Sequence, residues 1–290
     1  MSAGTETAPK PQRNARRIGG GILRTKTGLV GVVLFILTSV VALLGRYVAP
    51  YGPYDSLGIP GAAPGNGHLV GLDFIGRDVF SRLLYGGRST FILAGLATVV
   101  TYLIGASIGL VAGYSRSKID PILMRGIDIL ISLPALLVIL LLVTAFGGTS
   151  LVLVIATSLV LLPGVARIVR SATLEVSTRG YVEAAVARGE PTRTLLLREI
   201  FPNITGVITA DLGLRFSWSI ILIASVNFLG IGIQPPTADW GLMISENRVV
   251  IASDPLAVVG PSIVLAVLVV AVNLIGDAYV RQLDRSSASS

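Results

Sequence analysis

Apolar residues are grouped along this chain into five long intervals without Asp, Glu, Lys or Arg. These intervals are residues 27–45, 89–115, 129–166, 216–238 and 255–276. About 20 helical residues cross a hydrocarbon core of roughly 30 Å, so each interval is long enough to span a membrane. The third has 38 residues and must fold back, and the glycine- and hydroxyl-containing stretch 146–150 marks the break. The pattern predicts an all-α membrane protein with six transmembrane helices.

The composition supports this class and excludes several others. Hydrophobic residues make up 52% of the chain and charged residues 13%, against roughly a quarter charged in soluble domains. The chain has no cysteine and one histidine, which excludes disulfides, cysteine-bearing metal centres and a histidine cluster. The first interval is longer than the apolar region of a signal peptide and is not followed by a small-x-small cleavage site, so we interpret it as a retained helix.

The distribution of basic residues predicts the orientation. Of the 23 Lys and Arg residues, 17 lie in the N-terminal tail, residues 115–126, residues 167–203 and the C-terminal tail. The three opposite loops contain five. Because cytoplasmic loops are rich in Lys and Arg, both termini are expected in the cytoplasm. The basic charge is therefore an orientation signal with affinity for anionic lipid, and no nucleic-acid partner is expected.

The spans divide the chain into segments. We expect a basic cytoplasmic tail at 1–27, a first span at 28–45 and an external loop at 46–88. A five-helix core is expected at 89–280 and a cytoplasmic tail at 281–290. Within the external loop, residues 76–85 carry apolar side chains on one helical stripe, which predicts an interfacial helix before the second span. His68 in the same loop is expected to be solvated.

Three glycines in the second span recur every fourth residue. Gly105, Gly109 and Gly113 therefore share one face of the helix. A smooth face of this kind lets another helix approach closely in a membrane, so we expect helix packing there.

The largest inward-facing loop, 167–203, combines six Arg and four Glu with many apolar residues. We expect one helix over 173–188, a left-handed stop at Gly189, and a second helix with Pro191 as its first residue. On composition alone, such a helix-turn-helix is equally suited to filling a groove on a soluble partner or to lying on lipid headgroups.

Charges within the spans are few. Asp211 and Arg215 lie one helical turn apart near the predicted start of the fifth span, on one helix face. They are expected to pair or to face a water-filled translocation path. Because the chain has no G-x-x-x-x-G-K-[ST] motif, it is not expected to bind ATP. Its scattered aspartates also do not indicate a membrane enzyme with a metal–diphosphate site.

Four motifs, in order along the chain, resemble those of a known family. The stretch 181–189, YVEAAVARG, followed by Ile200, Phe201 and Pro202, is similar to the EAA loop of ABC importer permeases. Residues 76–86, 120–134 and 228–241 resemble further segments of the C-type permease subunit of oligopeptide and dipeptide importers. The resemblance covers about residues 22–283. Phe201 replaces the usual Leu, and Ile223 stands where the family often has an acidic residue.

This resemblance implies a type I ABC importer permease fold in a bacterial plasma membrane, with no catalytic activity of its own. Glu183, Ala184, Ala185 and Gly189 would belong to a loop that docks on an ATPase. The implied partners are a B-type permease, two cytoplasmic ATPase domains that bind ATP and magnesium, an external solute-binding protein and a peptide substrate. No cofactor is implied for this chain. Nickel or glutathione import stays open as an alternative, and so does a protein of another class, an ATP-independent channel or carrier.

Overall fold

The computed structural model of the chain describes residues 25–65, 67–115 and 118–287. Within these ranges every regular element is helical, and the only β-bridges are three isolated ones in the segment 56–78. The prediction of an all-α protein is confirmed. The predicted tail 1–27 lies almost entirely outside the described residues, as do the last three residues of the predicted tail 281–290.

Six membrane-crossing segments are present if one bent pair of helices is taken as a single span. Five helices are long and apolar enough to cross a bilayer on their own. They are α2 (Lys26–Leu44), α3 (Val79–Tyr114), α6 (Ser150–Ser177), α9 (Phe201–Phe228) and α11 (Leu256–Ser287). The bent pair consists of α4 (Ile119–Ser132) and α5 (Ala135–Phe146), whose axes meet at 87°.

The bend in the third span was not expected from its continuous apolar pattern. It lies at Leu133 and Pro134, and Leu133 has an extended backbone with φ −95° and ψ 136°. Proline disfavours a helical conformation in the residue before it and has no N–H for a helical hydrogen bond, so the chain leaves the helix here. The fold-back after Phe146 lies where the sequence predicts it, since α6 starts at Ser150.

The predicted interfacial helix at 76–85 is wrong. Residues from Val79 onward form the first turns of α3, a continuous helix of 36 residues. Asp78 caps it by accepting a hydrogen bond from the backbone N–H of Ser81. Val79 and Arg82 are fully buried, so this segment packs inside the protein. The polar residues opposite its apolar stripe contact other protein groups. An amphipathic pattern predicts that polar side chains have polar partners, but it does not tell whether these are protein groups, water or lipid headgroups.

The fifth span also differs from its predicted limits of 216–238. Helix α9 ends at Phe228, and residues 229–239 form a loop in which Gly230 has a left-handed backbone with φ +76°. The charge-free interval continues past the helix because this loop is apolar. At the other end, α9 starts before the interval because its two charged residues are paired inside the protein.

The helices pack around two main apolar clusters. Helix α3 lies along α6, and α9 contacts both of them. Phe91 of α3 links the neighbouring helices, with ring centroids 6.1 Å from Phe35 of α2 and 5.4 Å from Phe216 of α9. Helix α11 packs against α2 and α9 and covers the remaining side of the bundle.

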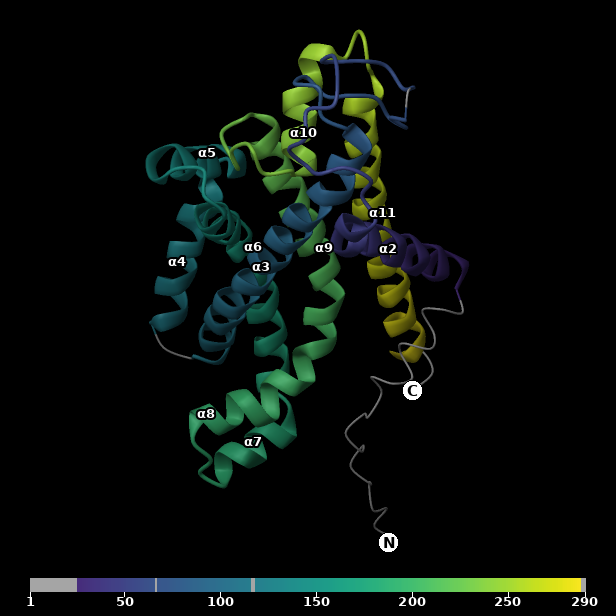
Figure 1. Cartoon of the computed structure of the whole chain (residues 1–290). Coiled ribbons are helices and arrows are strands. Elements are labelled where there is room, and N and C mark those ends of the chain that lie inside the picture. The colour runs from purple at the N-terminus through teal and green to yellow at the C-terminus, as the bar shows by residue number, and fades with distance from the viewer. Residues whose placement is uncertain (1–24, 66, 116–117, 288–290) are drawn as a thin grey trace, which may run out of the picture.

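The two ends of the bundle differ in structure (Figure 1). One end, which we call the loop end, has the short helices α7 (Gly180–Ala187) and α8 (Thr192–Thr194) and the π-helix η2 (Leu195–Ile200). The other, which we call the cap, consists of residues 48–78 and 229–255. It includes α10 (Trp240–Asn247) and the 3-10 helix η3 (Arg248–Val250). A short 3-10 helix, η1 (Gly45–Tyr47), joins α2 to the cap.

Candidate functional site

The loop end begins with a break in the helix predicted over 173–188. Helix α6 continues through Thr173 and ends at Ser177, whose hydroxyl donates to the carbonyl of Leu174. Arg179 then has an extended backbone, with φ −80° and ψ 141°, and α7 starts at Gly180. The prediction of one helix is therefore wrong, because hydroxyl side chains that bond to nearby carbonyls favour the end of a helix.

The turn after α7 depends on glycine. Gly189 has φ +78°, a conformation that costs other residues energy, and it ends the helix as the sequence predicts. Pro191 caps the following helix with an extended backbone instead of being its first residue. From Thr192 onward α8, η2 and α9 continue as one helical rod to Phe228. The second half of the loop is thus the start of the fifth span.

An apolar base holds α7 against this rod. Val182 of α7 and Ile200 of η2 are buried in one cluster with Val176 of α6 and Ile204 of α9. Ala185 is also completely buried. A small residue at this position lets α7 lie close to the rod, whereas a larger side chain would separate the two.

The opposite side of the loop is exposed and mixed in chemistry. Glu183, Ala184 and Pro202 are exposed, and the side chains of four larger apolar residues are 37–53% exposed. These residues are Tyr181, Val186, Leu197 and Phe201. Glu175 and Glu190 form ion pairs with Arg179 and Arg188. The Glu183 carboxylate has no hydrogen bond or ion pair among the described residues. The loop thus exposes apolar side chains together with an unpaired carboxylate, and exposed apolar groups gathered in one segment can mark a surface that binds another protein.

The glycines of the second span face α6. A Cβ atom at Gly109 would lie 2.6 Å from the carbonyl oxygen of Ala166, and one at Gly113 would lie 2.6 Å from that of Arg170. At Gly105 the nearest atom, in Val165, would be 3.1 Å away. The two backbones therefore approach closely along this stripe.

Asp211 and Arg215 lie at the middle of α9, not near its start as expected. The Arg215 Nε donates to Asp211 Oδ2 at 2.9 Å, and the Tyr102 hydroxyl of α3 donates to the same oxygen at 2.7 Å. The Asp211 and Arg215 side chains are 8% and 15% exposed. The pair is therefore largely enclosed between α3, α6 and α9, and it is electrically neutral.

The cap contains a buried group of four charges that the sequence did not indicate. Asp73 Oδ2 accepts from Arg77 Nε and from Arg82 Nη1, both at 2.6 Å. Glu246 Oε2 accepts from the same Arg82 nitrogen at 2.8 Å. The four side chains are at most 7% exposed. They join the 48–78 segment to both α3 and α10, elements far apart in sequence.

The expectation that His68 is solvated is wrong. Its Nδ1 lies 3.0 Å from Asp78 Oδ1, and its side chain is only 14% exposed. The His68 ring is also 5.3 Å from that of Tyr51. The histidine therefore links Tyr51 in the first part of the 48–78 segment to Asp78, the residue that precedes α3. Across the described ranges, no group of three His, Cys, Asp or Glu side chains is placed to hold a metal ion.

The apolar motif at 228–241 folds around a buried carboxylate. Asp239 accepts from the Thr90 hydroxyl at 2.8 Å and from the Asn227 amide at 2.9 Å, and it caps α10. Burial raises the pKa of Asp239, while these hydrogen bonds act in the opposite direction. The neighbouring Trp240 is fully buried and donates to the carbonyl of Leu83. The motif thus fastens the end of the fifth span to α3.

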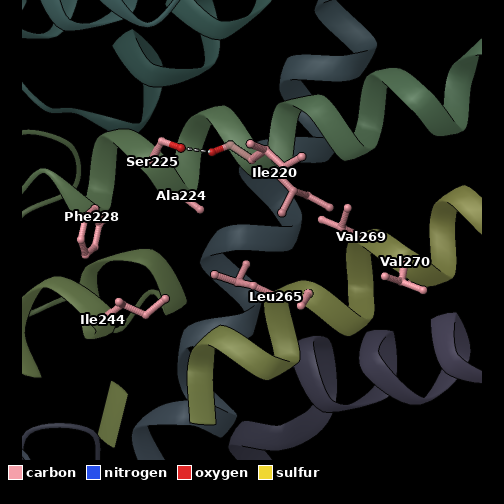
Figure 2. Close-up of a pocket in the computed structure, with 10 residues that line it drawn as sticks. Ile220, Ala224, Ser225, Phe228, Ile244, Leu265, Val269 and Val270 are labelled. Atoms are coloured by element: carbon pink, nitrogen blue, oxygen red, sulfur yellow. Dashed lines mark hydrogen bonds between the residues drawn. The ribbon is translucent and has the colours of Figure 1, made fainter. Parts of the chain in front are cut away.

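An apolar groove of about 440 Å³ lies between α9, α10 and α11. Figure 2 shows Ile220, Phe228 and Leu265 among its walls, with α3 behind both long helices. Ser225 is its only polar side chain, and the hydroxyl bonds to the carbonyl of Ile221 in the same helix. The groove therefore offers only apolar contacts.

Comparison with known proteins agrees with this architecture. Residues 105–288 match the family described as binding-protein-dependent transport system inner membrane component. A di/tripeptide transport system permease protein, DppC, of Pseudomonas aeruginosa is 37% identical over 89% of this chain and 88% of its own length. A glutathione transport system permease protein, GsiD, of Pectobacterium atrosepticum is 33% identical over 90% of this chain and 88% of its own.

A solved structure shares the fold. A chain of the MetNI methionine ABC transporter in an inward-facing conformation matches with a TM-score of 0.56 at 18% identity. The match covers 67% of this chain and 92% of that chain. Together these findings show that the protein belongs to the binding-protein-dependent transport system inner membrane component family. It has the type I ABC importer permease fold, and the predictions of its family and its inner-membrane location are confirmed.

Proposed function

We propose that this chain forms half of the translocation pathway of an ATP-driven peptide importer and is coupled to an ATPase through the loop end. The observation that carries the proposal is the exposed side of the loop end, where Glu183 is unpaired, apolar residues are exposed, and a buried apolar base lies beneath. A passive loop lying on lipid headgroups would not need an unpaired carboxylate, which anionic lipid repels.

In this proposal the loop end faces the cytoplasm and the cap faces outward. A B-type permease supplies the other half of the pathway, and an external solute-binding protein delivers peptide at the cap. Two ATPase domains bind ATP and magnesium, while this chain binds no cofactor and has no catalytic role. Closure of the ATPases would move the 173–203 loop and, through the rod that continues into α9, the spans around the pathway.

Replacing Glu183 with Lys tests the coupling. We expect Glu183→Lys to reduce ATP-driven peptide uptake by about tenfold or more, because it introduces a like charge opposite a basic group of the ATPase. Gly189→Val should also impair uptake, since φ +78° is strained for valine. Asp128→Lys is the matched control, because it reverses an exposed charge on α4 away from α7. Normal uptake by both loop variants would refute the docking role.

Glutathione is the second candidate substrate, because relatives named as glutathione permeases are 33–34% identical to this chain. Selectivity in such a system depends largely on the binding protein. Calorimetric titration of that protein with dipeptides, longer peptides and glutathione would identify the substrate class. Tight binding of glutathione alone would replace the peptide assignment by the second candidate.

A further inference from the structure

The cation at the centre of α9 has an unused hydrogen-bonding edge. Arg215 and Asp211 are the only charged residues of this 28-residue helix. Asp211 occupies the Nε of Arg215. The two Nη atoms of Arg215 have no hydrogen-bond partner in the part of the chain that the structure describes. A guanidinium presents these nitrogens as parallel donors that match the two oxygens of a carboxylate.

The guanidinium of Arg215 occupies the space that a glycine leaves open on α6. A Cβ atom at Gly164 would lie 2.5 Å from Arg215 Nη1 and 2.8 Å from its Cζ. Only glycine therefore leaves room for the guanidinium in this position. Asp211 on the same helix holds Nε, and Tyr102 of α3 donates to the same Asp211 oxygen, so α6 restricts Arg215 directly and α3 does so through Asp211.

The exposed part of Arg215 is recessed within an apolar helix face. Leu214 and Trp218, next to it on α9, are each 46% exposed, whereas the Arg215 side chain is 15% exposed. A charge near the middle of a span is costly in contact with lipid and usually faces a polar path or a partner. Because the two neighbouring apolar residues are more exposed than Arg215, a small mobile group can reach the guanidinium more easily than a flat partner helix can.

We infer that Arg215 binds the terminal carboxylate of the peptide during its passage and so helps determine which substrates cross. This inference rests on the proposed function. The carboxylate would accept from Nη1 and Nη2 while Asp211 keeps Nε. Because Asp211 already neutralises the guanidinium, a second carboxylate binds weakly. Weak binding suits a transport site, from which the substrate must leave as readily as it enters.

The test compares a peptide with its C-terminal amide in proteoliposomes that contain the complete transporter, with the binding protein saturated by each ligand. The wild-type chain should transport the free acid about tenfold or more faster than the amide, as expected for loss of a charge-assisted hydrogen bond. Arg215→Gln should bring this ratio close to one by slowing the free acid alone. Gly164→Ala should lower the ratio by displacing the guanidinium.

Two controls separate this role from a structural one. Gly206→Ala makes the same substitution at a helical position where an added Cβ meets nothing, and it should keep the wild-type ratio. The double variant Asp211→Arg with Arg215→Asp keeps an ion pair but moves the cation by one turn, and it should not restore the ratio. Restoration of normal selectivity by this exchange would overturn the inference in favour of a purely structural pair.

Other results also overturn the inference without affecting the proposed function. These are a wild-type ratio near one, or a high ratio that persists in Arg215→Gln. Loss of the second permease from purified Arg215→Gln complexes would assign Arg215 to a subunit contact instead. Failure of the wild-type complex to transport any peptide, with a binding protein shown to be loaded, would refute the proposed function itself.

Discussion

At the scale of single residues, charge burial is the main feature of this protein. The cap encloses Asp73, Arg77, Arg82 and Glu246 almost completely, and each arginine contacts both acids. Removing charged groups from water is costly, and mutual attraction offsets that cost only while every partner remains. The contribution of any one of these residues is thus best measured by removing it alone.

We expect Arg82→Met to lower the free energy of unfolding by about 3–5 kcal/mol, because Asp73 and Glu246 would lose a shared buried cation. Denaturant titration of the purified protein in mixed micelles measures this change. Arg167→Met provides the control, since Arg167 and Asp128 are more than half exposed and such pairs contribute less than about 1 kcal/mol. Equal effects of the two substitutions would contradict the assigned role of the cap charges.

Another buried acid, Asp254, predicts a pH dependence. Burial raises the pKa of Asp254, and the N–H groups of Leu256 and Ala257 offset only part of this rise. The folded state therefore binds the proton more tightly than the unfolded state. This stabilisation is complete below the ordinary aspartate pKa of about 3.9 and is lost as the pH rises through the raised value.

Asp254→Asn removes that titration while keeping an acceptor for the Leu256 N–H. The difference in Tm between the variant and the wild type should therefore shift in favour of the variant as the pH increases from 4. Thermal denaturation in detergent over a series of buffers measures this difference, in which the contributions of all other groups cancel. A difference that is constant with pH would show that Asp254 does not titrate differently in the folded state.

At the scale of elements, the close pairing of α3 with α6 organises the bundle. The glycine stripe brings the two backbones together, and the hydroxyl of Ser158 on α6 donates to the carbonyl of Ala97 on α3 at 2.9 Å. In a membrane, where lipid is as apolar as leucine, close van der Waals packing and hydrogen bonds hold helices together. A single methyl group added between the two helices should therefore lower the stability of the protein.

Gly109→Ala should destabilise the protein by about 1–3 kcal/mol, because the new Cβ would overlap Ala166 and Val169 of α6. Gly95→Ala is the matched control on the same helix, where an added Cβ has no neighbour within 4 Å. It should be neutral or slightly stabilising, since alanine favours a helix more than glycine does. Thermal denaturation of both variants in the same detergent provides the comparison.

At the scale of the whole molecule, the two ends of the bundle differ in structure, and the proposed function assigns them separate tasks. The loop end has an exposed face on a buried apolar base, which we propose as the docking face, and the cap is held by ion pairs and by Asp239. The continuous rod from Thr192 to Phe228 passes from the loop end to the cap and includes Arg215, which lies at the middle of α9. Under the proposed function, a movement applied at the loop end would reach the proposed carboxylate site and the cap through this one continuous segment.

The proposed orientation leads to a direct topology test, since the sequence contains no cysteine. Glu183→Cys and Thr237→Cys place single thiols at exposed positions on opposite ends. A membrane-impermeant maleimide should label Thr237→Cys in intact cells, but Glu183→Cys only after permeabilisation. The cysteine-free parent measures background labelling. The reverse pattern would place the loop end outside the cell and overturn the coupling proposal.

The sequence by itself determined the features that depend on local chemistry. The charge-free intervals predicted the helical membrane class, the glycines at 146–150 predicted the fold-back, and Gly189 predicted the turn. Each depends on composition or on backbone conformation over a few residues. The spacing of Asp211 and Arg215 likewise predicted that they could pair, because residues four apart share a helix face.

Only the tertiary structure decided where polar groups are satisfied. Arg82 and His68 have sequence surroundings typical of an interface or a loop, yet their partners come from segments that only folding brings near. The end of α9 at Phe228 was equally hidden, because an apolar loop against protein has the same composition as an apolar helix in lipid. Hydropathy predicts that a residue is removed from water, but it does not predict whether lipid or protein replaces the water.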